Sequence, residues 1–246
     1  MLNSLTYLRK LSKKILPPNE VKCVIEIGAN KCTESIDFTN LYPHADIYPF
    51  ECNPDTIPLC REAIKDQPNI HLMEMAVSDT IGTLDFFPID TTKSVTPHKD
   101  GNPGASSLFK KNEKIVFQND KLVQKKVSVQ STTLKEFMIG KKIASIDILW
   151  LDAQGAELMI LRGAGELISS IRLIQCEVEF IEEYEKQPLY KDIKSFLSKK
   201  GFIFCGFSDE WYPHAADAIF MHKDTFKRLG FYEKIICRIS ALMPLK

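Results

Sequence analysis

The sequence has no run of apolar residues long enough to cross a membrane, which takes about 20 residues. Its first 18 residues also lack the continuous apolar stretch and the small-residue cleavage site of a secretory signal. Seven cysteines are present but none are spaced C-x-x-C, so neither a zinc knuckle nor a disulfide framework is expected. These absences predict a protein of the reducing cytoplasm.

The chain also lacks net charge, because 32 Lys and Arg balance 32 Asp and Glu. That balance is uneven: residues 1–22 carry +4 and residues 224–246 carry +3, which leaves −7 for the middle. An acidic body argues against a large nucleic-acid footprint, since such a footprint needs a basic face. We therefore expect no nucleic-acid partner, and one domain over residues 23–223 with a basic helical extension at each end.

Both extensions mix apolar and basic residues at helical spacing, as in TYLRKLSKKIL and FKRLGFYEKIICRISALM. Such helices pack on the domain or on a second subunit, or lie at a membrane surface as interfacial helices. Packing on the sheet or on a second subunit is the favoured interpretation, and peripheral membrane contact is the alternative. The pattern leaves the oligomeric state open.

What the sequence does contain is an alternation of short apolar strands with helices. Strands are expected at residues 23–27, 45–51, 69–77, 146–152, 171–180, 201–207 and 217–222, and helices at 32–41, 54–64, 155–168 and 189–199. This order predicts an α/β fold with a mainly parallel sheet covered on both faces. Residues 83–87 and 125–130 are expected to pair as a hairpin around a long loop, and such loops often bind ligands.

The first strand ends in a glycine turn that leads directly into a helix. Gly28 lets the backbone approach a ligand closely, and the N–H groups that open the helix can bind an anionic group. Glu51 ends the second strand, 23 residues after Gly28, where a carboxylate can hold ribose hydroxyls. The turn is not G-x-G-x-x-G, so S-adenosylmethionine suits it better than a nicotinamide dinucleotide.

Several segments resemble the FkbM family of S-adenosylmethionine-dependent methyltransferases. They are IEIGAN (25–30), PFECNP (49–54), MAVSDTIG (75–82), GASSL (104–108), VQSTTLKEF (129–137), CEVEF (176–180), DAIF (217–220) and, most specifically, IDILWLDAQGAELMILRGA (146–164). The resemblance implies a class I methyltransferase (Rossmann-like) fold with a seven-stranded sheet whose last strand is antiparallel. It also implies methylation of a hydroxyl on a sugar, glycolipid or polyketide-type acceptor.

The same resemblance implies the residues that hold the cofactor. The methionine part is expected beside Glu26, Gly28, Ala29 and Asn30, the ribose at Glu51, and the adenine by Ser78 and Asp79. The sequence departs from the family at two positions. Cys32 replaces the glycine usual at the end of the turn, and Trp150 stands where many relatives have lysine.

Methyl transfer to an alcohol requires removal of the hydroxyl proton by a general base or with the help of a metal. Asp152, at the end of the strongest strand, is the first candidate, although it could instead cap the next helix. Glu177 on the neighbouring strand could join Asp152 in holding Mg²⁺ or Mn²⁺. His214, in the loop before the last strand, is a further candidate base because histidine titrates near neutrality.

Three residues are candidates for contact with the acceptor. Trp150 shares a strand face with Asp152 and could stack on a sugar, or could belong to the core. Ser106 and Ser107 lie in the long loop as possible hydroxyl donors, or as ordinary turn residues. The sequence predicts an O-methyltransferase acting on a glycan or glycolipid, with an NAD(P)-dependent oxidoreductase or a non-catalytic cofactor-binding protein as alternatives.

Overall fold

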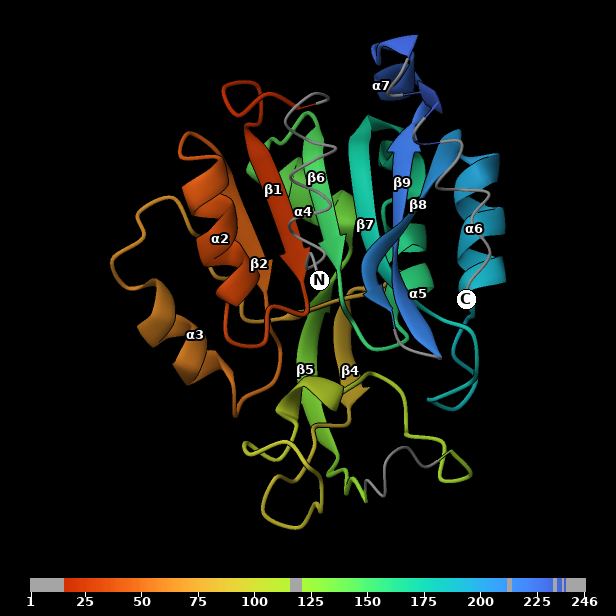
Figure 1. The fold of residues 1–246 in the computed structure, drawn as a ribbon. Helices are drawn as coiled ribbons and strands as arrows, with labels where there is room; N and C mark the ends of the chain where they lie inside the picture. The colour runs from red at the N-terminus through yellow and green to blue at the C-terminus, as the bar shows by residue number, and fades with distance from the viewer. Residues whose placement is uncertain (1–15, 116–120, 212–213, 232–233, 236, 238–246) are drawn as a thin grey trace.

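The computed structural model describes residues 16–115, 121–211, 214–231, 234–235 and 237. Its centre is a twisted sheet of six strands in the order β2-β1-β6-β7-β9-β8 (Figure 1). The strands are β1 (Cys23–Ile27), β2 (Asp46–Phe50), β6 (Ile146–Leu151), β7 (Ile171–Glu179), β8 (Phe202–Trp211) and β9 (Ala215–His222).

Strand direction follows the class I methyltransferase pattern. β1, β2, β6 and β7 pair in parallel, whereas β9 runs antiparallel to both of its neighbours, β7 and β8. Every residue of β1 and of β6 is buried, as expected for parallel strands covered on both faces. The antiparallel last strand is the one that the family resemblance implies.

The third predicted strand is the main difference from the expected seven. Residues 69–77 do not form a continuous strand: Ile70 and Met73 make isolated parallel bridges to β2. A tight turn follows, in which the Met75 N–H donates to the Met73 carbonyl at 3.0 Å. The chain then enters a second sheet. The main sheet therefore has six strands, and Ile70 and Met73 only form bridges to its edge strand β2.

The second sheet has the order β3-β5-β4, with β3 (Ala76–Val77), β4 (Gly82–Phe86) and β5 (Val127–Thr132). β4 and β5 pair antiparallel, which confirms the predicted hairpin. The long loop between them contains a short 3₁₀ helix, η1 (Pro103–Ala105). Figure 1 shows this loop region beyond the ends of β4 and β5.

Helices cover both faces of the main sheet and create two cores. The helices are α2 (Thr33–Leu41), α3 (Ile57–Ile64), α4 (Leu134–Lys141), α5 (Glu157–Gly163), η2 (Gly165–Ser170), α6 (Tyr190–Lys199) and α7 (Lys223–Lys227). Buried residues of α4, α5 and α6 form one core with the sheet, and those of α2 and α3 form the other. Predicted helix 54–64 begins later, at Ile57, because an Asn53-centred turn occupies residues 53–56.

Parts of both predicted extensions lie outside the described residues. Within the described part, Leu16 is buried, and so are Phe226, Leu229 and Cys237. All four belong to the core on the α2 side of the sheet. These four residues therefore pack with the sheet residues of that core. None of the described helices is long and apolar enough to span a bilayer.

Candidate active site

The turn after β1 brings its backbone against the end of β6. Gly28 has φ +89°, and a Cβ at this position would lie 1.7 Å from the Asp152 carbonyl oxygen. The Gly28 and Ala29 N–H groups both donate to the Phe50 carbonyl of β2, at 3.1 and 3.0 Å. Only glycine fits this conformation and this contact, so Gly28 determines how closely β1, β2 and β6 meet.

Cys32, just before α2, has a backbone conformation that favours glycine, the residue usual at this position in the family. Its φ is +58°, the left-handed conformation that costs a residue with a side chain on the order of 1 kcal/mol. The thiol is fully buried in the core on the α2 side. The burial of this small side chain offsets part of that backbone cost, and α2 still begins at Thr33, within a residue of its predicted start.

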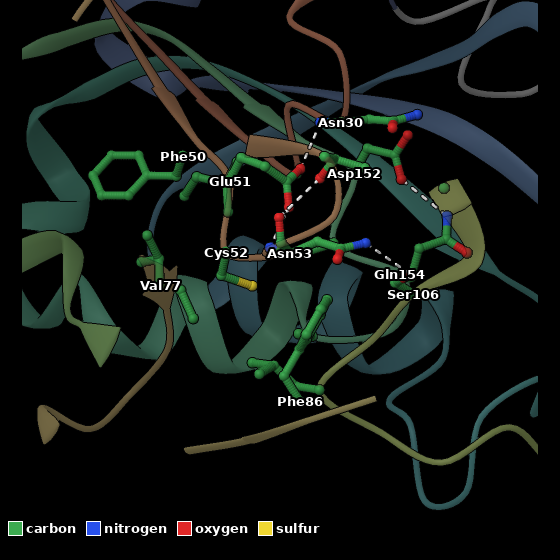
Figure 2. Close-up of a pocket in the computed structure, with 18 of the residues that line it drawn as sticks. Asn30, Phe50, Glu51, Cys52, Asn53, Val77, Phe86, Ser106, Asp152 and Gln154 are labelled. Atoms are coloured by element: carbon green, nitrogen blue, oxygen red, sulfur yellow. Dashed lines mark hydrogen bonds between the residues drawn. The ribbon is translucent and has the colours of Figure 1, made fainter. Parts of the chain in front are cut away.

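Glu51 is the central polar group of the site. Its Oε2 accepts from the Asn30 N–H at 2.6 Å and its Oε1 from the Asn53 N–H at 2.7 Å (Figure 2). Burial raises the pKa of Glu51, while these backbone hydrogen bonds oppose the rise. A carboxylate carries lone pairs on both oxygens, so it is the kind of acceptor to which the hydroxyl groups of a ligand can donate.

A pocket opens over this carboxylate, with one apolar side and one polar side. Phe50, Val77 and Phe86 lie on the apolar side, and Asn30, Glu51, Asp152 and Gln154 on the polar side (Figure 2). It contains about 660 Å³ of empty space, part of which is open to the solvent. Its apolar and polar sides match a flat base and a ribose with an amino-acid tail.

The Asn30 side chain adds an unsatisfied acceptor to the pocket wall. Its Oδ1 is buried and has no hydrogen-bond partner among the described residues. Such an orphaned atom costs about 1–3 kcal/mol unless a ligand donates to it. The ammonium group of a methionine moiety is a donor of the right kind, so the residues present fit S-adenosylmethionine.

Asp152 follows β6 and is exposed on the pocket wall. Its Oδ1 accepts from Gln154 Nε2 at 2.9 Å, and the same nitrogen donates to Glu177 Oε2 at 2.6 Å. Gln154 Oε1 accepts from the buried Tyr184 hydroxyl at 2.7 Å. One amide thus holds Asp152 beside the pocket and connects it to β7 and to the loop that carries Tyr184.

Two further carboxylates, those of Glu177 and Glu157, lie close to Asp152. Burial, and then the charge of Asp152, raise the pKa of Glu177 well above its ordinary range. Burial raises the pKa of the fully buried Glu157 to about 7, although its Oε1 accepts from the Ala153 and Gly155 N–H groups. The pKa of Glu157 thereby falls in the pH range in which an acid–base group works.

The remaining residues predicted for the cofactor lie around the pocket but not in its lining. Glu26 is buried beneath the turn, where it accepts a hydrogen bond from Ser35 of α2, and Ala29 is a core residue. Ser78 is buried against Thr80, and Asp79 is exposed. The pocket wall from this part of the chain is Met75–Val77, just before the predicted pair.

The three residues predicted to contact the acceptor lie in different places. Ser106 lines the pocket, and its hydroxyl accepts from Asn53 Nδ2 at 3.3 Å. Ser107 is buried and donates to the Gln154 carbonyl at 2.7 Å, which supports the wall. Trp150 is 7% exposed and packs edge-on against Phe38 of α2, with ring centroids 5.5 Å apart. The structure therefore corrects the stacking interpretation of Trp150: it is a core residue, as the alternative held.

His214 and the predicted metal site are not supported by the geometry. His214 Nε2 lies 3.2 Å from Glu183 Oε1, beyond the described lining of the pocket. Between Asp152 and Glu177 the structure places the Gln154 amide nitrogen, a donor, where a cation would have to bind. Across the described residues, no group of three His, Cys, Asp or Glu side chains is arranged to hold a metal ion.

Several pocket-related residues were not predicted from the sequence, among them Asn53, Gln154 and Tyr184. Asn53 and Gln154 stand inside the segments PFECNP and LDAQGAE, so their neighbourhood was a signal for them. Tyr184 comes from a loop after β7, and its hydroxyl also donates to the Ala105 carbonyl at 3.0 Å. No local pattern marks it, because its role depends on contacts between distant segments.

Comparison with known proteins agrees with this geometry. Residues 26–204 match the Methyltransferase FkbM domain. The chain is 29% identical over 195 residues to the 2-O-methyltransferase NoeI of Sinorhizobium fredii, covering 79% of this chain and 78% of that protein. It is 25% identical over 215 residues to the methyltransferase sdnD of Sordaria araneosa, covering 80% and 79%.

A solved structure shares the fold. The methyltransferase FkbM from Methylobacillus flagellatus superposes with a TM-score of 0.51 at 10% identity, covering 82% of this chain and 44% of that one. The family match, the antiparallel last strand and the glycine turn facing Glu51 and Asp152 all agree. The chain belongs to the FkbM family of S-adenosylmethionine-dependent methyltransferases.

Proposed function

We propose that the protein transfers a methyl group to a hydroxyl of a sugar, glycan or glycolipid. An oxygen acceptor is supported by the name of its relative, a 2-O-methyltransferase. The sugar class rests on the family resemblance of the sequence. The observation that carries the proposal is the exposed carboxylate of Asp152 on the wall of the pocket that contains Gly28 and Glu51.

Residues on both sides of this pocket would bind the cofactor. Glu51 would hold the ribose hydroxyls, Asn30 Oδ1 would accept from the ammonium group, and Phe50, Val77 and Phe86 would contain the base. S-adenosylmethionine supplies a methyl group on a positively charged sulfur. Holding that group and the hydroxyl in line provides much of the rate acceleration, because positioning removes an entropic barrier.

Asp152 would take the proton of the attacking hydroxyl. Gln154 fixes its carboxylate by donating to Oδ1. The same amide nitrogen donates to Glu177, so Gln154 also fixes the position of Glu177 next to Asp152. No step of this scheme requires a metal ion.

The Asp152→Asn variant tests the assignment. Transfer of a radiolabelled methyl group would be followed on a panel of mono- and oligosaccharides, glycolipids and phenolic alcohols. We expect turnover to fall by about 100- to 10,000-fold, the usual contribution of a general base, while S-adenosylhomocysteine still binds. Unchanged turnover would remove Asp152 from the mechanism, and labelling of phenols alone would overturn the sugar class. A wild-type protein that binds the cofactor but labels no acceptor would favour the non-catalytic alternative.

We propose the cytoplasm as the location of the protein. All seven cysteines are free thiols in the structure, which suits a reducing compartment. Contact with anionic membranes through the basic ends is a separate proposal, and flotation with acidic liposomes tests it. Failure to bind at low salt would rule out that contact.

A further inference from the structure

We propose that Tyr184 is a positioning residue for methyl transfer, because its hydroxyl holds the Gln154 amide in the orientation that presents Nε2 to Asp152. This inference rests on the proposed role of Asp152 and adds to it a residue outside the pocket lining. Tyr184 is 1% exposed and lies in the loop between β7 and α6. Since its side chain is buried outside the pocket, it acts through Gln154.

Both ends of the Gln154 amide are hydrogen-bonded in this orientation. Nε2 has two protons and donates to Asp152 Oδ1 at 2.9 Å and to Glu177 Oε2 at 2.6 Å. Oε1 accepts from the Tyr184 hydroxyl at 2.7 Å. The reversed amide would lose both donations from Nε2 and would place its own oxygen against two carboxyl groups. The carboxyl groups and the tyrosine hydroxyl therefore hold opposite ends of one amide.

The Tyr184 hydroxyl has one proton and two possible acceptors. It lies 2.7 Å from Gln154 Oε1 and 3.0 Å from the Ala105 carbonyl oxygen. Because a phenol has a single proton, the shorter distance identifies Gln154 Oε1 as its main acceptor. Without this donor the amide oxygen would be unpaired beside a buried ring, which is unfavourable. The Gln154 side chain would then turn away from Asp152.

The backbone around Gln154 is fixed by other contacts. The Ser107 hydroxyl donates to the Gln154 carbonyl at 2.7 Å. Gln187 accepts from the Tyr184 N–H and packs on the next residue, where a Cβ on Gly155 would lie 3.1 Å from its own Cβ. Gln154 itself has φ +51°, a conformation that persists where its surroundings determine it. Loss of the tyrosine hydroxyl should therefore change the orientation of the amide and leave the backbone in place.

NMR of the Gln154 side-chain amide tests the inference in protein labelled with ¹⁵N-glutamine, which occurs seven times in the chain. The matched control for Tyr184→Phe is Tyr190→Phe, whose ring packs in an aromatic cluster against Phe180 and Phe207. The signal that is missing in Gln154→Met identifies the amide. We expect its protons to exchange with water about fivefold faster or more in Tyr184→Phe, because the amide loses one of three hydrogen bonds. Equal exchange in the wild type and Tyr184→Phe overturns the inference.

The second readout is methyl transfer to an acceptor that the wild type labels. Tyr184→Phe should lower kcat about tenfold or more at unchanged KM and unchanged S-adenosylhomocysteine affinity, since the misplaced group is Asp152. The double variant Gln154→Met/Tyr184→Phe should be no slower than Gln154→Met alone, because both substitutions act at one amide. Additive losses, or a loss confined to KM, overturn the inference.

Failure of the proposed function has a different signature. A wild type that binds S-adenosylhomocysteine but labels no acceptor contradicts the proposed function, and amide exchange still decides whether Tyr184 holds the amide. If Tyr184→Phe does not fold, the wild-type amide is compared with that of the exposed Gln130. Exchange about tenfold slower at Gln154 supports the inference, and equal exchange at the two residues overturns it.

Discussion

At the scale of single residues, Gly28 carries the strongest constraint of the site. A Cβ there would lie 1.7 Å from the Asp152 carbonyl, so Gly28→Ala must separate the ends of β1 and β6. We expect S-adenosylhomocysteine affinity to fall by about 100-fold or more, since displacements near 1 Å have effects of this size. The matched control is Gly140→Ala on α4, where a Cβ meets nothing within 4 Å. The control should bind normally; equal behaviour of both variants would contradict the close approach.

Glu157 makes the stability of the folded protein depend on pH. Burial raises its pKa to about 7 from an ordinary 4.5, so the folded state favours the protonated form. Its contribution to stability is therefore complete below pH 4.5 and is lost as the pH rises through about 7. Relative to Glu157→Gln, the wild-type free energy of unfolding should fall over this range by on the order of 3 kcal/mol. Urea unfolding at several pH values measures this difference, and parallel curves for the two proteins would contradict it.

Several residues that the sequence singles out by their ties to backbone geometry come together in the structure. Gly28, Asn30, Glu51, Asp152 and Ser106 all line one pocket, as the strand ends and the loop motif suggested. Tyr184 could not be predicted, because its hydroxyl meets Gln154 and Ala105 from a distant loop. Trp150 lies in the core on the α2 side, where it packs against the ring of Phe38, and period two alone could not reveal this contact.

At the scale of elements, the N-terminus of α4 depends on one hydroxyl. Thr133 Oγ1 accepts from the Glu136 N–H at 3.1 Å, the first half of a capping box. Thr133→Ala should lower the free energy of unfolding by about 1 kcal/mol, within a usual range of about 0.5–2 kcal/mol. Thr133→Ser keeps the acceptor and should be nearly neutral in the same chemical denaturation experiment. A neutral alanine variant would show that the cap contributes nothing.

Elements were predictable where apolar periodicity was unbroken. The strands at residues 23–27 and 146–152 and the helices at 32–41 and 189–199 lie within a residue or two of their predicted bounds. The strand predicted at 69–77 failed because a turn at Met73–Met75 moves the chain from one sheet to another. Local apolar content cannot reveal which sheet a strand will join.

At the scale of the whole molecule, the site is produced by topology. Parallel pairing brings the carboxyl ends of β1, β2 and β6 to one edge, the usual ligand edge of open α/β sheets. Residues far apart in sequence, Gly28, Glu51 and Asp152, thereby surround one pocket. Described residues near both ends of the chain belong to this architecture as well, since Leu16 and Phe226 are buried in the core on the α2 side.

The most direct test of this account is calorimetric titration with S-adenosylhomocysteine, comparing the wild type with Glu51→Gln. Glutamine keeps the size of the side chain but removes a charged acceptor for the ribose hydroxyls. We predict wild-type binding and an affinity about tenfold or more lower in the variant, because hydrogen bonds to charged groups contribute roughly 1.5–3 kcal/mol. NAD⁺ and NADP⁺ should not bind. Equal affinity of the two proteins, or dinucleotide binding without S-adenosylhomocysteine binding, would contradict the account.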